Sequence, residues 1–212
     1  MRGRASGGVP AFVISASLLL GAAAARGDDD GRIHQGRILR LATGLAYLRE
    51  SWSPSGGTAD AVHTGWGPAL EVTVGKFVRP RLVLAGSLQL TGIINRDETT
   101  LGATYPLDDT LHFVDTLSAL VDFYPSPRRG LHFGGSLGLA AITELDTHMG
   151  GTQTSFGFAA ALHAGTALFV SRRWSVGGMA RLGFHRSGSD TPPPDATTTG
   201  LLASLLLAAT FD

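Results

Sequence analysis

The sequence predicts an all-β protein, an eight-stranded antiparallel up-and-down transmembrane β-barrel that follows a cleaved signal peptide. Three observations lead to this fold class. The chain begins with a secretory leader, eight later segments alternate apolar with small or polar residues, and the connectors between them alternate long and short. No segment after the leader has the roughly 18 consecutive apolar residues that a membrane helix needs.

The first 25 residues have the layout of a secretory signal peptide. Arg2 and Arg4 precede the apolar run 9–20, and the small residues Ala23, Ala24 and Ala25 offer a cleavage site. We therefore expect a signal peptide at 1–25, a periplasmic tail at 26–35 and a barrel at 36–212. An uncleaved signal anchor is the alternative. The short acidic run 28–30 is interpreted as a solvated tail.

Composition excludes several classes of protein. The 17 basic and 17 acidic residues cancel, which argues against a general nucleic-acid binder. The chain has no cysteine and therefore no disulfide framework, thiolate metal site or cysteine nucleophile. Only 16% of residues are charged and 29 of 212 are glycine, which is unusual for a cytosolic enzyme.

Eight segments carry the strand pattern, and their two faces are unequal. In 37–50, Leu39, Leu41 and Leu45 share one face, whereas Arg40 and Ala42 share the other. Leucine and phenylalanine suit lipid, and small residues with a few charges suit the interior of a narrow barrel. A soluble barrel with the faces exchanged is the alternative. The predicted strands span 37–50, 66–77, 82–92, 117–124, 131–142, 155–169, 174–185 and 200–211.

The connectors predict the orientation of the barrel. Long connectors at 51–65, 93–110, 143–154 and 187–199 alternate with short ones at 78–81, 125–130 and 170–173. Long extracellular loops and short periplasmic turns are typical of these barrels, and an even strand number puts both termini in the periplasm. Aromatic residues fall near the expected rims: Phe123, Phe133, Trp174 and Phe211 on the periplasmic side, and Tyr47, Trp66 and Phe184 on the extracellular side.

This pattern resembles the small eight-stranded outer-membrane proteins of the OmpA/OmpX type over about residues 36–212. The end of the chain, LLASLLLAATFD, resembles the strand by which the barrel assembly machinery recognises such proteins, with Leu205, Leu207 and Phe211 as the assembly signal. Asp212 departs from that pattern because the aromatic residue is penultimate. The resemblance implies a monomer in a Gram-negative outer membrane, in contact with its lipid, and includes adhesins and serum-resistance factors.

Four charged residues are predicted to face the lumen as a polar network: Arg40, Glu71, Asp122 and Arg181. An eight-stranded barrel is just wide enough for side chains to fill, so we interpret the network as a plug of ion pairs. A conducting polar channel is the alternative. Replacing Glu71 with alanine should destabilise the barrel or open it, because an unpaired buried charge is costly.

Other candidate sites have simpler interpretations. His132 and His163 are predicted to face inward as hydrogen-bonded histidines, not as metal ligands. The His185-Arg186-Ser187 run is similar to the His-x-Ser pair of barrel lipid A deacylases, but the parity of its His and Ser points inward, away from lipid. Asp115 shares parity with lipid-facing residues, and we place it at the extracellular rim or beyond a bulge.

The function expected from these features is a non-enzymatic surface scaffold without cofactor or metal. Its four long loops would contact an extracellular ligand and support envelope integrity or adhesion. A narrow pore for small solutes, a lipid-modifying barrel enzyme and a soluble periplasmic barrel are the alternatives.

Overall fold

The computed structural model describes residues 34–53, 60–107, 110–126, 130–146, 151–189 and 196–212. It contains nine strands: β1 (Arg37–Ser53), β2 (Ala61–Arg79), β3 (Leu82–Thr100), β4 (Ala103–Leu107), β5 (Thr110–Phe123), β6 (His132–Asp146), β7 (Gly151–Phe169), β8 (Trp174–Ser189) and β9 (Ala196–Phe211). Within these residues there is no helix long and apolar enough to cross a membrane. The predicted signal peptide lies outside the described residues, as do most of the predicted tail and parts of the predicted loops.

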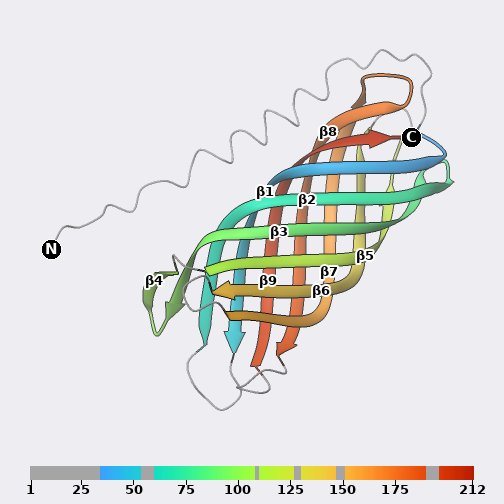
Figure 1. Ribbon diagram of the computed structural model, residues 1–212. Coiled ribbons are helices and arrows are strands. Elements are labelled where there is room, and N and C mark those ends of the chain that lie inside the picture. Colours follow the sequence, from blue (N-terminus) through green and yellow to red (C-terminus); the bar gives the residue numbers. More distant parts are fainter. Residues whose placement is uncertain (1–33, 54–59, 108–109, 127–129, 147–150, 190–195) are drawn as a thin grey trace, which may run out of the picture.

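Eight of the strands close into a ring, which confirms the predicted barrel. Neighbours along the chain pair antiparallel, except that β3 pairs with both β4 and β5, and β1 pairs with β9 to close the ring. Figure 1 shows the ring and the short β3–β4 hairpin that extends from one end of it. An open sheet edge in lipid would leave backbone groups unpaired at several kcal/mol each, so closure is required of a membrane barrel.

The strands are longer than the alternation predicted, and the extracellular connectors are correspondingly shorter. Residue pairing between β1 and β2 continues to Trp52 and Ala61, and pairing between β6 and β7 continues to Asp146 and Gly151. The predicted connector at 93–110 contains the end of β3 and the whole of β4. These segments were missed because polar residues occupy both faces of a strand once it leaves the membrane.

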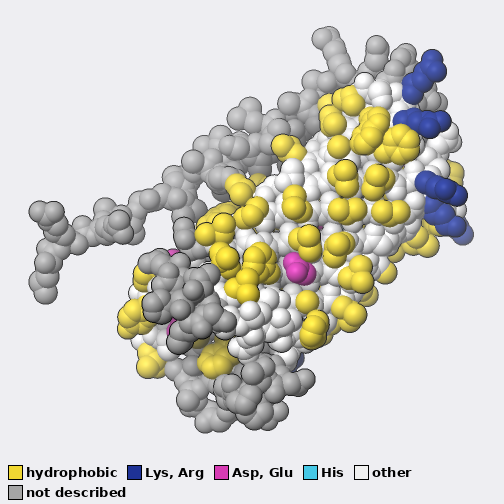
Figure 2. Space-filling view, in the orientation of Figure 1, with side chains coloured by type: hydrophobic (Ala, Val, Ile, Leu, Met, Phe, Trp, Pro, Cys, Tyr) yellow, Lys and Arg dark blue, Asp and Glu magenta, His cyan; other side chains and the backbone are white. Residues whose placement is uncertain are grey.

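Large apolar side chains face outward from every strand of the ring and form a band that we call the apolar belt. Their exposed fractions are high for leucine, for example 63% at Leu117 and 70% at Leu162. Figure 2 shows hydrophobic side chains over the visible wall of the barrel. A belt of this kind fits lipid, and the soluble alternative with exchanged faces is wrong. One exposed member from each strand of the ring is Leu41, Leu70, Leu88, Leu117, Leu139, Leu162, Leu182 and Leu205.

Aromatic contacts border the apolar belt at both ends. Phe123 packs on Phe133 with ring centroids 5.4 Å apart, and Trp174 packs on Phe211 at 5.3 Å. At the other rim, Tyr47 packs on Trp66 at 4.8 Å. Phe184 packs there on Phe158 at 5.8 Å. These cross-strand pairs lie at the two ends of the apolar belt, where the aromatic residues of interfacial girdles are expected.

Asp115 is half-buried and faces outward, between Leu90 of β3 and Ala141 of β6. Of the two placements considered for Asp115, the bulge is wrong, because the β3–β5 pairing is continuous from Leu82 to Ile93. The carboxylate instead accepts a hydrogen bond from the backbone of Thr91. Asp115 lies two residues inside Phe113, close to the extracellular rim, where an acidic residue costs less than at the midplane.

Candidate functional site

The four predicted network residues all lie buried in the lumen and form two ion pairs. Arg40 Nη2 donates to Asp122 Oδ2 at 2.8 Å, and Arg181 Nη1 donates to Glu71 Oε2 at 2.6 Å. Thr73 donates to the other oxygen of Glu71 at 2.9 Å. Arg40 of β1 meets Asp122 of β5, and Arg181 of β8 meets Glu71 of β2. Each ion pair therefore spans the lumen between strands that are not neighbours in the ring.

The two inward histidines complete the Arg40–Asp122 pair. His132 Nε2 accepts from Arg40 Nη1 at 3.0 Å, and its Nδ1 donates to the Gly130 carbonyl at 3.0 Å. His163 Nε2 donates to Asp122 Oδ1 at 3.1 Å. Among the described residues no three His, Cys, Asp or Glu side chains come together as a metal site. Both histidines form hydrogen bonds inside the lumen.

An apolar layer lies above these ion pairs, toward the extracellular side. Leu48, Ile93 and Val114 are completely buried, and Leu202, the pairing partner of Leu48, is 4% exposed. They belong to one cluster with smaller side chains from β1, β2 and β9. We call Leu48, Ile93, Val114 and Leu202 the septum. Buried apolar side chains at this level favour a closed lumen over a wet one.

A second ionic group lies directly above the septum, and we call it the mouth cluster: Glu50, Arg96, His112, Glu144 and His185. Glu50 accepts from His185 Nε2 at 2.9 Å and faces His112 Nε2 at 3.2 Å. Arg96 donates to His112 Nδ1 at 2.8 Å and to Glu144 at 2.6 Å. Glu144 is 41% exposed at its side chain, so the cluster reaches solvent on one side. Sequence reasoning did not predict this cluster.

The strand extension beyond the mouth cluster carries a further pair. His63 Nε2 lies 3.2 Å from Glu98 Oε2, between β2 and β3. Burial and the nearby positive charge of Arg96 lower the pKa of His63, despite the opposing effect of Glu98. The lowered pKa favours a neutral His63 as the hydrogen-bond partner of Glu98.

The predicted candidates for a hydrolase do not assemble into a catalytic group. His185 and Ser187 both point into the lumen, as their parity predicted. Ser187 Oγ accepts from Ser155 Oγ at 3.1 Å, and His185 pairs with Glu50. A serine nucleophile needs a base within hydrogen-bond reach, and the described contacts of Ser187 include no such base.

A residue from the predicted tail is buried at the periplasmic end of the lumen. His34 Nδ1 lies 2.6 Å from Asp212 Oδ2, and both side chains are almost completely buried. The His34 ring stacks on Phe169 at 4.3 Å and packs beside Tyr124 at 5.2 Å. Asp212, the departure from the usual terminal pattern, thus joins the last strand to the segment before the first.

The residues of the predicted assembly signal face outward on β9. Leu205 and Leu207 are 41% and 60% exposed, and Phe211 contacts Trp174. Their pairing partners on β1 are Leu45, Thr43 and Leu39. They therefore lie on the strand that closes the barrel, and their recognition by the assembly machinery stays a prediction.

Comparisons with known proteins agree with the geometry. No family model and no curated protein matches the sequence. Among solved structures, the fold resembles Neisserial surface protein A (NspA) with a TM-score of 0.52, at 12% identity, over 84% of this chain and 99% of that one. OprG of Pseudomonas aeruginosa gives a TM-score of 0.49 at 12% identity, over 84% of this chain and 97% of that one.

The outer membrane protein AlkL gives a TM-score of 0.47 at 12% identity, over 88% of this chain and 95% of that one. At such low identity, the likeness to NspA is evidence for the fold alone. Together with the apolar belt and its aromatic rims, it identifies the architecture. This chain has the fold and the lipid-facing exterior of the small eight-stranded outer-membrane β-barrels.

Proposed function

We propose that the protein is a non-enzymatic outer-membrane scaffold whose lumen is closed and whose extracellular strand extension contacts other molecules, in support of envelope integrity or adhesion. The observation that carries the proposal is the filled lumen. Two buried ion pairs, the septum and the mouth cluster follow one another along it. A pore would need a continuous wet path, and these buried layers support a closed scaffold instead.

The tip of the β3–β4 hairpin supports a contact role for the extension. Its two-residue turn places Leu101 at φ 53° and Gly102 at φ 81°. Turns of this kind favour Asn-Gly, and a leucine with positive φ is strained by roughly 1–2 kcal/mol. Leu101 is 87% exposed and Tyr105 is 58% exposed. A strained backbone at an exposed apolar residue supports a role for the hairpin tip in binding another molecule.

Single-channel recording tests the closed lumen. Purified protein in planar bilayers should give no discrete conductance steps. The double variant Glu71→Ala/Arg181→Ala removes both partners of one ion pair and leaves no unpaired charge, and it tests whether the septum and the mouth cluster alone keep the lumen closed. Regular steps from the unmodified protein would contradict the closed scaffold and favour the narrow pore.

Cell binding tests the hairpin. Cells that express Leu101→Asn or Tyr105→Ala should be retained less on bare, hydrophobic polystyrene than cells with the unmodified protein. Val170→Asn is the matched control, because Val170 is 61% exposed at the opposite end of the barrel. Equal retention of all four strains, together with unchanged detergent resistance, would contradict a contact role for the hairpin.

A further inference from the structure

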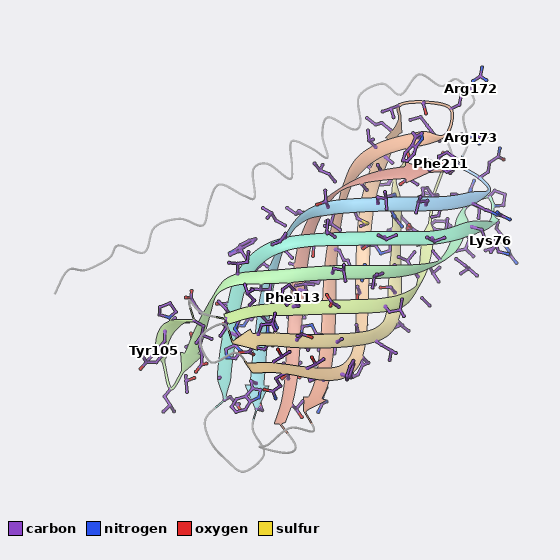
Figure 3. All side chains as sticks on the ribbon, viewed as in Figure 1. Lys76, Tyr105, Phe113, Arg172, Arg173 and Phe211 are labelled. Carbon is purple, nitrogen blue, oxygen red and sulfur yellow. The ribbon has the colours of Figure 1, made fainter. Side chains whose placement is uncertain are left out.

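The periplasmic end of the barrel carries exposed cations that the closed-scaffold function does not use. Six basic side chains there are exposed, and we call them the basic arc: Arg37, Lys76, Arg79, Arg81, Arg172 and Arg173. Figure 2 shows dark blue side chains gathered at this end, and Figure 3 labels Lys76, Arg172 and Arg173 there beside Phe211. They come from β1, β2 and the turns that precede β3 and β8.

Within the described ranges, acidic side chains do not balance the basic arc. Of the described acids, Asp60, Asp97 and Glu98 lie in the extracellular extension. At the periplasmic end, Asp212 turns its carboxylate into the lumen against His34, where 2% of its side chain is exposed. Among the residues that the structure describes, the exposed cations of this end therefore lack nearby exposed carboxylates.

The members of the basic arc lack ion-pair partners among the residues that the structure describes. Arg37 and Lys76 are in addition directly opposed across β1 and β2. Like charges in that position destabilise a sheet, and an anion between them would remove the repulsion. A negatively charged group bound between these two cations, at the edge of the lipid-facing wall, would therefore stabilise the barrel.

The depth of the basic arc indicates what that neighbour is. Arg37 lies two residues before Leu39 of the apolar belt, and Lys76 lies two residues after Val74, which is 60% exposed. Both cations therefore lie just past the periplasmic edge of the belt. The Arg173 guanidinium lies 5.9 Å from the centroid of the Phe211 ring, at the aromatic rim. Cations next to interfacial aromatic residues lie at the level of lipid headgroups.

The arrangement of the basic arc is a band around the wall and not a compact patch on the end. In the order of the ring it runs from the β2–β3 turn through β2 and β1, passes Phe211 of β9, and ends in the β7–β8 turn. A band parallel to the membrane plane fits a row of lipid phosphates better than one face of a globular partner.

We propose that the basic arc binds the phosphate groups of anionic phospholipids in the periplasmic leaflet. The cations supply point charges and guanidinium donors for phosphate oxygens, and the adjacent apolar belt receives the acyl chains. The binding anchors the depth of the barrel and is independent of whether the lumen conducts or the hairpin binds a ligand.

Trp174 provides a local reporter, because it lies next to Arg173 and packs on Phe211. In a Trp52→Phe/Trp66→Phe background, the full chain is reconstituted into phosphatidylcholine vesicles that contain brominated phosphatidylglycerol or brominated phosphatidylcholine. Bromine quenches Trp174 only from lipids in contact with this rim. We expect the anionic lipid to be preferred by at least about threefold, and the preference to fall in 1 M salt.

The deciding variant is Arg37→Gln/Lys76→Gln/Arg172→Gln/Arg173→Gln, in which the preference should fall to about one. Its residues are exposed, so folding should persist, and a heat-dependent gel shift checks this. Arg49→Gln/Arg186→Gln is the matched control, because both residues are exposed near the opposite rim. This control should keep the preference.

Two results would overturn the proposal. One is equal quenching by the two brominated lipids in the unmodified protein, whether or not the protein then sediments with purified cell-wall sacculi. Such sedimentation would assign the basic arc to a periplasmic acidic polymer. The other is a preference that survives in the quadruple variant, which would show that other residues select the lipid.

Discussion

The membrane-embedded half of the barrel and its extracellular extension hold their charges in different ways. In the embedded half, Arg181 and Glu71 form a pair in which both side chains are at most 3% exposed. In the extension, Glu50 is shared between two histidines, and Glu144 of the same cluster is 41% exposed. The Arg181–Glu71 pair depends on both partners because each is the other's only ion-pair partner among the described residues, whereas a shared and partly wet cluster can compensate for a loss. The difference predicts a larger cost for breaking the embedded pair than for breaking a contact of the mouth cluster.

The largest effect is expected from breaking an embedded pair. Arg181→Met leaves Glu71 buried without its cation and should lower the free energy of unfolding by about 3–5 kcal/mol. Equilibrium urea unfolding in lipid vesicles measures this loss. The double variant Glu71→Leu/Arg181→Met should recover most of it, because no uncompensated charge remains. If the double variant is as unstable as the single one, the loss comes from packing and not from the charge.

A smaller loss is expected in the mouth cluster. Glu50→Gln leaves one acceptor for two histidine donors and should cost about 1–2 kcal/mol in the same unfolding assay. Glu144→Gln is the matched control, and its partly exposed side chain should make its cost less than about 1 kcal/mol. The comparison of the two regions would be wrong if Glu50→Gln cost as much as Arg181→Met.

The smallest effect, and the only gain, is expected at the hairpin tip. Leu101→Asn relieves the positive φ of Leu101 and should raise the free energy of unfolding by about 1 kcal/mol. Leu101→Val should lower it, since a β-branched residue tolerates this conformation worse. Loss of stability in Leu101→Asn would mean that the leucine packs favourably and is not strained.

The sequence predicted the embedded half well, because lipid outside and a narrow lumen inside enforce a period of two. That periodicity placed Arg40, Glu71, Asp122 and Arg181 on the inward face. It did not predict which acid meets which base. The partners are separated by 82 and 110 residues along the chain, and their meeting depends on the stagger of the closed ring.

The extension was predicted less well for a physical reason. Beyond the extracellular aromatic rim, outward positions such as Arg49, Thr64 and Thr99 are polar, so the contrast between the two faces disappears although the strands continue. Arg96 therefore lay in the predicted connector 93–110, and His112 lay between that connector and the predicted strand 117–124. Gly102 and Pro106 are ordinary loop signals, and they concealed the β3–β4 hairpin.

The seam between β1 and β9 has a consequence for how the protein forms. It pairs Leu39 with Phe211, and the His34–Asp212 contact beside it joins residues 178 apart in the chain. Loop-closure entropy makes such distant pairing late and slow. Every other strand pair joins segments that are close neighbours in the chain, so these can pair while the seam is still open. Until β9 pairs with β1, both strands expose unpaired backbone N–H and C=O groups. The longer this intermediate lasts, the greater is its risk of pairing edge to edge with another copy of the chain.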